Sequence, residues 1–430
     1  MLDAKLLKEN PSVIEKMLSM RGVDFPLEDL VSLDMRRREL ISQLQDLKHK
    51  KNILADSIAR KKKETVTATS VNSEINEMKD ISKRIAELEL EQERVLGKYR
   101  HLMMSLPNLL HESVPVGRSE KENVVVKEQG QKRARTTITL KDHIDIASSL
   151  DLIDLERAAK ISGARFYFLK NELVKMNLAL IQLGLDYLSG RGYTLVQPPY
   201  MIRKEAMEGA VILGDFEQVI YKLEDEDLYM IGTSEHAMVS MHMDEILDSS
   251  RLPLRYASVS PCFRKEAGAH GRDMKGIFRV HQFEKVEQVI FSRPEDSWKE
   301  HERMLDLTER LYENLGLPVR TVLLCSADIG KISAKTYDIE AWFPEQNSYR
   351  EIVSCSNCID YQARRLRIRY RDNVNEETKL VHTLNSTLIA TERTMVSIIE
   401  NYQTENGTVE VPDVLQKYMG DAKAIKLFSK

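Results

Sequence analysis

The fold is decided by the stretch Tyr256-Ala-Ser-Val-Ser-Pro-Cys-Phe-Arg264-Lys-Glu266, a glycine-containing connection, and Phe278-Arg-Val-His-Gln-Phe283-Glu-Lys-Val-Glu287. Apolar and aromatic residues give both ends strand character, while the glycine and polar residues between them are typical of a turn. The pattern therefore predicts an antiparallel pair of strands closed by a long loop. Because alternate side chains of a strand face the same way, residues 264 and 266 should share a face, as should 283, 285 and 287.

This face combines an arginine, carboxylates and an aromatic ring, a set that can hold a nucleotide beside an amine. Arg264 would bind a phosphate through two nitrogens, and the ring of Phe283 would stack on a base. A half-exposed hairpin with ordinary surface ion pairs has the same composition. The residues of this stretch by themselves leave both interpretations open.

The paired motifs Phe-Arg-x-Glu and Arg-Val-His-Gln-Phe-x-Lys-Val-Glu resemble the second signature motif of class II aminoacyl-tRNA synthetases, in the form that seryl-tRNA synthetases carry. Helices are predicted over residues 143–156 and 169–188, and the second of these, followed by a strand ending at Pro199, is similar to the first motif, which builds the dimer interface. Residues 383–393 before an apolar helix are similar to the third motif, although the three glycines of the general class pattern are missing. The resemblance extends over essentially the whole chain.

Length and composition describe a soluble protein of more than one domain. A chain of 430 residues is too long for one ordinary core, so two domains are expected. Apolar residues make up 42% and charged residues 30%, no apolar run approaches membrane-spanning length, and the first residues do not resemble a signal peptide. Four unevenly spaced cysteines do not suggest a disulfide framework. We therefore expect a cytoplasmic protein with no membrane partner.

The N-terminal quarter has the apolar spacing of two long helices. Apolar residues recur at alternating three- and four-residue steps from Leu33 to Ile58, and a second register runs from Met78 to Leu106. A polar stretch over residues 64–72 separates them, so the pattern predicts an antiparallel coiled-coil hairpin. Residues 107–126 lack periodicity and mark a linker. The predicted domains are residues 1–110 and 111–430, and the fold class is α+β, with an antiparallel sheet flanked by helices after the hairpin.

Basic residues gather toward the turn of this hairpin. Such a charge run is commonly the solvated face of a coiled coil, and the net charge of −4 argues against indiscriminate binding of nucleic acid. A basic tip also suits contact with a phosphate backbone. Seryl-tRNA synthetases grip tRNA with such an arm, so the resemblance implies that these residues bind tRNA: Lys50, Lys51, Arg60, Lys61, Lys62 and Lys63.

Two further motifs have a structural interpretation beside a functional one. Thr233-Ser-Glu235 opens a predicted helix and fits an N-cap with an acidic first turn, whereas the resemblance makes it the loop that contacts serine. Cys355-Ser-Asn-Cys358 has the spacing of half a zinc site, but a cysteine-only site would need two more cysteines from distant strands, so zinc is not expected. In the seryl family this segment lines the ATP site, and its cysteines pack.

The resemblance implies a serine–tRNA ligase that works in two steps. Serine and ATP give seryl-adenylate and pyrophosphate, and the seryl group then passes to the 3′ end of tRNA(Ser), with tRNA(Sec) as a further acceptor where it is present.

The residues implied in catalysis are Arg264, Glu266 and Arg393. The implied ATP site comprises Arg264, Lys265, Glu266, Val280, Phe283, Glu351, Ile352, Val353, Ser354 and Arg393. The implied serine site comprises Thr233, Ser234, Glu235, Arg264, Glu287, Asn385 and Thr387, with the contact to the serine hydroxyl left open between Asn385 and Thr387. Mg²⁺ is expected beside Glu351 and Ser354, and the protein is expected to form a homodimer.

Two rival classes of function are weighed against this one. The chain could be a class II relative that activates another amino acid or no longer charges tRNA, or a non-catalytic coiled-coil protein that binds RNA or acts as a scaffold. Charged residues such as Arg264, Glu287 and Arg393 argue against the scaffold, which has no use for buried charges. The hairpin arm argues against other class II members.

Overall fold

The computed structural model describes residues 1–63, 68–132, 140–266 and 276–427, with only the backbone for residues 62–63 and 68–71. The chain divides into two compact units. Unit 1 comprises residues 1–19 and 23–106, and unit 2 comprises residues 20–22 and 107–430. Within the described ranges, no helix is both long enough and apolar enough to cross a membrane.

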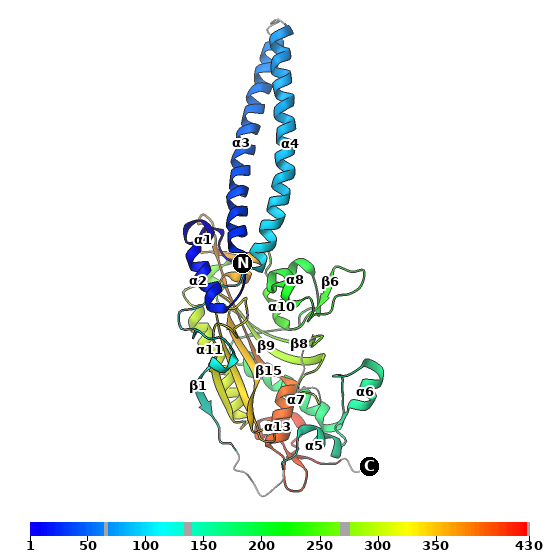
Figure 1. Cartoon of the computed structure of the whole chain (residues 1–430). Helices are drawn as coiled ribbons and strands as arrows, with labels where there is room; N and C mark the ends of the chain where they lie inside the picture. Colours follow the sequence, from blue (N-terminus) through cyan, green and yellow to red (C-terminus); the bar gives the residue numbers. More distant parts are fainter. Residues whose placement is uncertain (64–67, 133–139, 267–275, 428–430) are drawn as a thin grey trace. The chain divides into compact units, whose positions relative to one another are not determined.

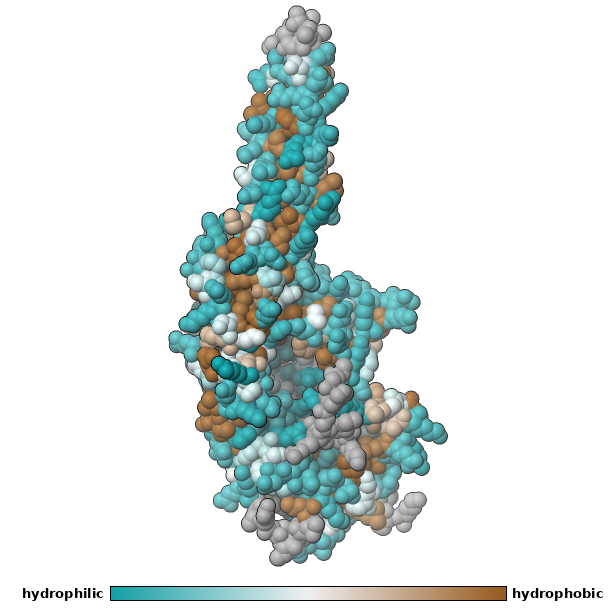
Figure 2. Space-filling model, viewed as in Figure 1, coloured by the Kyte–Doolittle hydropathy of each residue, from teal (hydrophilic) through white to brown (hydrophobic). Residues whose placement is uncertain are grey.

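Unit 1 confirms the predicted helical hairpin. Short helices α1 (Ala4–Glu9) and α2 (Pro11–Arg21) precede α3 (Leu27–Lys63) and α4 (Ala68–Ser105). The two long helices lie side by side (Figure 1), and apolar side chains show along the line between them on an otherwise hydrophilic surface (Figure 2). The seam has the heptad spacing expected of a coiled coil. Its buried residues are Leu40, Leu44, Ile81, Ile85 and Leu88.

The second long helix begins earlier than the sequence pattern suggested. Residues 68–72 were predicted as part of a polar break, but α4 begins at Ala68 and includes them. Serine, threonine and asparagine each cost a helix well under about 1 kcal/mol relative to alanine, and neither glycine nor proline occurs in this segment. Polarity was therefore a poor guide to where the helix starts.

Unit 2 is built on a sheet that, within the described ranges, has eight strands in the order β1-β10-β11-β12-β15-β9-β8-β4. Neighbouring strands are antiparallel except β4 and β8, which are parallel. The predicted strand pair is β8 and β9, in which Ser258 lies opposite Glu287 and Ser260 opposite Lys285. The predicted α+β class is confirmed. The strands are β1 (Val124–Gln129), β4 (Thr194–Val196), β8 (Leu254–Phe263), β9 (Gln282–Ser292), β10 (Val319–Leu323), β11 (Lys335–Phe343), β12 (Ser348–Asn357) and β15 (His382–Ala390).

One face of the sheet packs against three helices. α7 (Asn171–Ser189), α11 (Ser297–Asn314) and α13 (Thr391–Asn401) bury the main apolar core with residues of β9 such as Val286. A Cβ added at Gly184 of α7 would come within 3.2 Å of the Val286 side chain. Glycine at this position therefore lets the helix backbone approach the sheet closely.

The opposite face is divided between a second helical layer and open space. α8 (Lys204–Ala210), α10 (Ser234–Val239) and α12 (Tyr361–Leu366) cover the part of β9 that carries Val289 and Phe291. Because strand side chains alternate, residues 283, 285 and 287 lie on this same face, as predicted, but before the region that the helices cover. The fold thus leaves one end of this strand pair open for a site.

One predicted helix is interrupted in the structure. The helix predicted over residues 143–156 is α5 (His143–Ser149), the short strand β2 (Ile153–Asp154) and α6 (Leu155–Ser162). Asp151 adopts a left-handed φ of 54°, which ends the first helix, and the Asp154 carboxylate accepts from the backbone N–H of residue 157 and begins the next. Aspartate side chains readily form hydrogen bonds with nearby backbone groups, and these bonds compete with the hydrogen bonds of the continuous helix that the apolar spacing suggested.

The strand pair also ends sooner than predicted. β8 ends at Phe263, so Arg264 and Glu266 do not share a face of the sheet, and Glu266 has a left-handed φ of 47°. Likewise β1 begins at Val124, inside the segment predicted to be a linker. The predicted loop between β8 and β9 falls on residues 267–275, which lie outside the described residues.

The remaining elements are short and connect the larger ones. They are β3 (Phe168–Leu169), β5 (Met201–Arg203), β6 (Leu228–Met230), β7 (Ile246–Asp248), β13 (Arg369–Arg371), β14 (Lys379–Leu380), β16 (Val409–Glu410), β17 (Ala424–Ile425), α9 (Leu213–Phe216), α14 (Asp413–Gln416) and the 3₁₀ turns Glu120–Glu122, Ser249–Arg251 and Lys417–Met419.

Candidate active site

A cavity of about 1190 Å³ lies on the open part of the sheet. Ligand pockets commonly measure about 300–1,000 Å³, so this one has room for a nucleotide together with an amino acid. Most residues of the predicted ATP and serine sites line it. They are Thr233, Glu235, Arg264, Glu266, Val280, Phe283, Glu287, Glu351, Ile352, Ser354, Asn385, Thr387 and Arg393.

Three residues of the predicted sites do not line the cavity. The ammonium of Lys265 lies 5.7 Å from the ring centre of Tyr221, and Val353 is buried in the main core. Ser234 is also buried, and its hydroxyl donates to the carboxylate of Glu287. These three residues could therefore contact a bound ligand through their backbone atoms, or act on it through a neighbouring residue.

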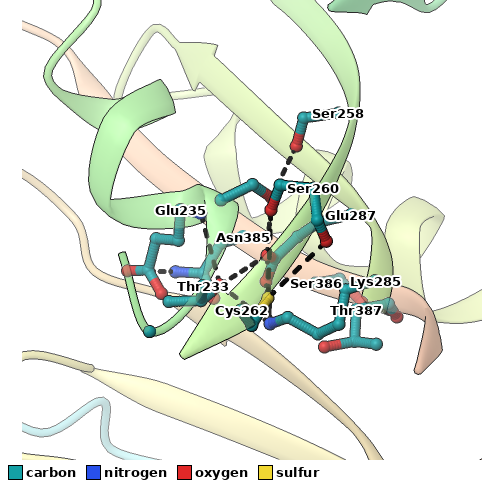
Figure 3. Close-up of polar contacts among 12 residues, drawn as sticks. Thr233, Glu235, Ser258, Ser260, Cys262, Lys285, Glu287, Asn385, Ser386 and Thr387 are labelled. Atoms are coloured by element: carbon teal, nitrogen blue, oxygen red, sulfur yellow. Dashed lines mark hydrogen bonds and ion pairs between the residues drawn. The ribbon is translucent and has the colours of Figure 1, made fainter. Parts of the chain in front are cut away.

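A group of buried polar side chains around Glu287 lines the cavity, and Figure 3 shows their contacts. Its Oε2 accepts from Thr233 Oγ1 at 2.5 Å and from Ser234 Oγ at 2.9 Å, and Lys285 Nζ lies 3.1 Å away. Lys285 also donates to Thr233 Oγ1 at 2.8 Å. Burial by itself raises the pKa of Glu287, but the ammonium of Lys285 and the hydroxyl donors outweigh burial and hold the pKa below its ordinary value. Glu287 is thus a carboxylate in a site that excludes most water.

Thr233 is a helix cap and also lines the cavity. It is the N-cap of α10, with Oγ1 accepting from the backbone N–H of Glu235 at 3.3 Å, so the structural interpretation is confirmed. The same hydroxyl contacts Lys285 and Glu287, as described above. The cap therefore fixes a polar side chain at the cavity wall.

Glu235 is a second carboxyl group beside the first (Figure 3). Its Oε1 accepts from Gln362 Nε2 at 2.9 Å and from Asn385 Nδ2 at 3.0 Å. Burial, followed by repulsion from Glu287, raises its pKa from 4.5 to about 7. Two neighbouring carboxyl groups therefore differ in charge near neutral pH.

The structure separates the two candidates for the serine hydroxyl. The amide of Asn385 is already engaged with Glu235 and lies 3.9 Å from the sulfur of Cys358. Thr387 lies opposite Glu287 in the β15–β9 register and lines the cavity, and its hydroxyl has no side-chain hydrogen bond among the described residues. Thr387 is therefore the more available of the two.

Two arginines also line the cavity. Arg264 Nε donates to the carbonyl of Gly232 at 3.0 Å, and its guanidinium carbon lies 5.2 Å from the ring centre of Phe283. Arg393, in the first turn of α13, lies 3.2 Å from a carboxylate oxygen of Glu351. These contacts hold two guanidinium groups at the wall of one cavity, which suits phosphates.

Glu266 has a partner that the sequence analysis did not assign. Its Oε2 lies 2.9 Å from Arg279 Nε, and the backbone carbonyl of Glu266 accepts from Arg165 at 2.9 Å. Both Glu266 and Arg279 line the cavity. Arg279 is the first residue of the motif Arg-Val-His-Gln-Phe and adjoins the predicted Val280, so its place in the motif was the available signal.

A β-bulge explains how Glu351 and Ser354 come to line the same cavity. Residues three apart on a regular strand point to opposite faces. Val353 of β12 pairs with Ile339 of β11, and Glu351 of β12 pairs with Glu340 of β11. Val353 and Glu351 are two residues apart but their partners are adjacent, so the β12 residue between them has no partner and forms the bulge.

The oxygen-bearing side chains of Glu351 and Ser354 suit Mg²⁺, which prefers oxygen ligands. Within the described ranges no group of three or more histidine, cysteine, aspartate or glutamate residues could hold a metal ion, so a metal here would depend on phosphate oxygens.

Sequence reasoning missed Lys285 and Asp338 as residues of the site. Lys285 is buried between Thr233 and Glu287, and the alternation that placed residues 283, 285 and 287 on one face was a sufficient signal for it. Asp338 of β11 lies opposite Ser354 and lines the cavity. Its sequence context, a strand of the general sheet, gave no comparable signal.

The four cysteines are buried and form no disulfide bond. Burial raises the pKa of Cys355 to about 12 and that of Cys262 to about 11, and it also raises the pKa of Cys358. Thiols of this kind behave as small packing side chains.

The predicted tRNA-binding residues lie on the hairpin of unit 1. Lys50 and Arg60 are exposed and Lys51 is half-buried. Lys61 forms an ion pair with Glu74 of the other helix at 2.6 Å. The side chains of Lys62 and Lys63 lie outside the described residues.

The fold and this site are those of a class II aminoacyl-tRNA synthetase, and comparison with known proteins agrees. Residues 220–402 match the family model of the tRNA synthetase class II core domain (G, H, P, S and T), and residues 1–110 match the seryl-tRNA synthetase N-terminal domain. The serine–tRNA ligase of Nitrosopumilus maritimus is 57% identical over 99% of this chain and 100% of its own. The chain belongs to the seryl-tRNA synthetase family.

Two solved structures have the same fold over the full length. The seryl-tRNA synthetase of Pyrococcus horikoshii complexed with ATP superimposes with a TM-score of 0.93, is 46% identical, and covers 100% of both chains. The cytoplasmic serine–tRNA ligase of Naegleria fowleri in complex with AMP has a TM-score of 0.87 and 36% identity over 100% of this chain and 99% of its own.

Proposed function

We propose that this chain is a serine–tRNA ligase that joins serine to tRNA(Ser) through a seryl-adenylate. The observation that carries the proposal is the buried group of Glu287, Thr233 and Lys285 in a cavity that is also lined by Arg264 and Arg393. A carboxylate and hydroxyl groups fit the ammonium and hydroxyl of serine, and guanidinium groups fit phosphates. Relatives named serine–tRNA ligase, and the ATP complex of the Pyrococcus horikoshii enzyme, support it.

Activation requires positioning more than proton transfer. An oxygen of the serine carboxylate attacks the α-phosphorus of ATP, and the bond from that phosphorus to the bridging oxygen breaks, so that pyrophosphate leaves with the electron pair. The nucleophile is already an anion, so no general base is needed. Arg264 would hold the α-phosphate, and Arg393 would neutralise the γ-phosphate.

In the second step the seryl group passes to tRNA. The oxygen of a ribose hydroxyl at the tRNA 3′ end attacks the seryl carbonyl carbon, AMP leaves with the electron pair of the C–O bond, and the hydroxyl proton passes to solvent or to AMP. The residues that hold the adenylate in the first step keep its carbonyl in place for the second.

Serine would be recognised by three groups at the polar end of the cavity. Glu287, ionised because of Lys285, suits the serine ammonium. Thr233 and Thr387 would contact the serine hydroxyl, with Asn385 keeping Glu235 in place. A site that binds a hydroxyl rejects alanine, because the polar groups of the site would then be left without partners.

ATP would lie between the aromatic and the charged residues. Phe283 would stack on adenine, and Glu266 would accept from the adenine amino group through the oxygen that Arg279 leaves available. Lys265, Val280, Ile352 and Val353 complete the proposed ATP site through nearby backbone or apolar contacts.

The oxygens of Glu351 and Ser354 would hold Mg²⁺ together with the phosphates. When bound, Mg²⁺ neutralises charge on the phosphates. Glu351 also contacts Arg393, so one carboxylate orients both the arginine and the ion.

The direct test is serine-dependent exchange of pyrophosphate into ATP. Serine should support exchange, whereas threonine, alanine and cysteine should support it far less. If another amino acid supports exchange better than serine does, that amino acid replaces serine as the proposed substrate. If a folded protein shows no exchange with any amino acid, the proposed activity is excluded.

The hairpin arm of unit 1 would bind tRNA and leave activation unaffected. We therefore expect removal of matched heptads from both helices to preserve pyrophosphate exchange and to weaken seryl transfer through tRNA affinity. Arg60→Glu should weaken tRNA binding more than Lys61→Glu, because Lys61 already pairs with Glu74. Loss of pyrophosphate exchange in a folded, shortened variant would contradict the proposal that the arm binds tRNA without affecting activation.

Acceptance of tRNA(Sec) stays a prediction, and charging assays with that tRNA would test it.

We also propose a homodimer, with α7 at the interface. Val174 and Leu178 are exposed apolar residues one turn apart on α7, at 39% and 59%, and Leu195 on the edge strand β4 is 46% exposed. Val174→Glu with Leu178→Glu should give a monomer in light scattering, whereas the control Ile161→Glu, at an exposed position of α6, should not. A dimer that survives the double change would place the interface elsewhere.

A further inference from the structure

Asp338 occupies the middle of the sheet on the face that lines the cavity. It lies on β11 directly opposite Ser354 of β12, and the β12 bulge brings Glu351 to the same cavity. Its neighbours along β11, Tyr337 and Ile339, belong to the core on the other face. The carboxyl group of Asp338 is therefore directed to the proposed phosphate end of the site.

The three carboxyl groups at this end differ in their partners. Glu340 Oε2 lies 2.5 Å from Arg320 Nε, and Glu351 Oε1 lies 3.2 Å from Arg393. Asp338 has no ion pair among the described residues, and its Oδ1 is buried without a hydrogen-bond partner. A buried carboxylate oxygen without a partner is costly, so it is commonly matched by something that binds there.

A cation supplied with the substrate fits this oxygen better than a protein group does. Mg²⁺ is commonly bound by one or two carboxylates together with substrate phosphates, and it favours hard oxygen donors. Ser354, assigned above to the metal, is the cross-strand neighbour of Asp338. We propose that Asp338 is a third protein residue of the Mg²⁺ site, binding the ion of the Mg·ATP complex through Oδ1, directly or through one water molecule.

This inference rests on the proposed function, because it concerns the ion that accompanies ATP. It predicts that Asp338 makes nucleotide binding depend on the metal. With the ion present, the carboxylate attracts Mg·ATP. Without the ion, the carboxyl group offers the phosphates of ATP no favourable contact.

The test compares Asp338→Asn, which keeps the shape of the side chain, with Glu340→Gln as a matched control. Glu340 lines the same cavity two residues along β11, but its carboxylate is paired with Arg320. Binding of ATP is measured by calorimetry in excess Mg²⁺ and in excess EDTA, and binding of Mn²⁺ in the presence of ATP is measured by electron paramagnetic resonance. Thermal unfolding establishes that each variant is folded.

For Asp338→Asn we expect Mn²⁺ affinity in the presence of ATP to fall by about 10–100-fold, as for other residues that support a metal. ATP binding in EDTA should be unchanged or tighter, and Glu340→Gln should keep the wild-type Mn²⁺ affinity. As a second variant, Asp338→Glu keeps a carboxylate and should recover part of that affinity.

Three results would overturn the inference. Unchanged Mn²⁺ affinity in Asp338→Asn would remove the residue from the metal site. Equal loss of ATP binding with Mg²⁺ and with EDTA would make it a packing residue, as would variants that fail to fold. Failure of the wild-type protein itself to bind Mg·ATP would instead contradict the proposed function, so the two failures are distinguishable.

Discussion

Replacing Glu235 by glutamine should change how the stability of unit 2 depends on pH. Glutamine keeps the oxygen that accepts from Gln362 and Asn385, and it removes the ionisable group. In the unfolded chain the carboxyl group titrates near its ordinary 4.5, but in the folded protein its pKa is about 7. Folding therefore favours the protonated form.

The sign and size of the effect follow from this difference. Below about pH 4.5 the group is protonated in both states and contributes no loss of stability. As pH rises toward 7, the unfolded chain releases the proton first, so the free energy of unfolding falls, and the loss is complete above pH 7. One pKa unit corresponds to about 1.4 kcal/mol, so the shift from 4.5 to about 7 gives at most about 3.5 kcal/mol. Glu235 is half-buried, so we expect about 1–3 kcal/mol after solvent screening.

The assay is urea unfolding of the wild type and Glu235→Gln at a series of pH values between 5 and 8, at one protein concentration. Other titrating groups and any dimerisation cancel in the difference between the two proteins. That difference should move in favour of the variant by about 1–3 kcal/mol as pH rises. Glu226→Gln, at an exposed position, is the control and should show no such trend. A difference that stays constant within a few tenths of a kcal/mol would refute the assignment of a raised pKa to Glu235.

The remaining predictions concern the arginine, the buried lysine, the hydroxyl contact and the cysteines. Arg264→Lys keeps the charge but loses the paired nitrogens, so serine-dependent pyrophosphate exchange should fall by about tenfold or more; near-normal exchange would remove Arg264 from the phosphate site. Lys285→Met leaves the Glu287 carboxylate buried without its cation, so the melting temperature should fall and the KM for serine should rise; unchanged values of both would show that the ion pair is dispensable. Thr387→Val keeps the shape of the side chain and should reduce the preference for serine over alanine by about tenfold or more, and an unchanged preference would return the contact to Asn385. Changing Cys355 and Cys358 together to alanine should lower the melting temperature and leave the metal content unchanged, whereas stoichiometric zinc in the wild type that is lost in this variant would make the pair metal ligands.

Much of the candidate site could be predicted because its residues belong to local motifs. Strand alternation placed Phe283 and Glu287 on one face, whereas Thr233 to Glu235 were assigned to the serine site only because the segment resembles the corresponding loop of the seryl family. Asn385 and Thr387 could be placed on one strand, but not ranked. Ranking them required the contact between Asn385 and Glu235, whose residues lie far apart in the chain.

Local patterns in the sequence were enough to predict the hairpin arm and the β8–β9 pair, because heptad spacing and strand alternation are periodic within a short segment. The tertiary structure was needed to establish the ionisation of the site. Glu235 and Glu287 are both glutamates, yet burial and repulsion raise one pKa, and the ammonium of Lys285 lowers the other. It also decided that Asp338 lies beside Ser354, through the pairing of β11 with β12. Charge and burial depend on which distant segments are brought together, and no periodicity in the chain records that.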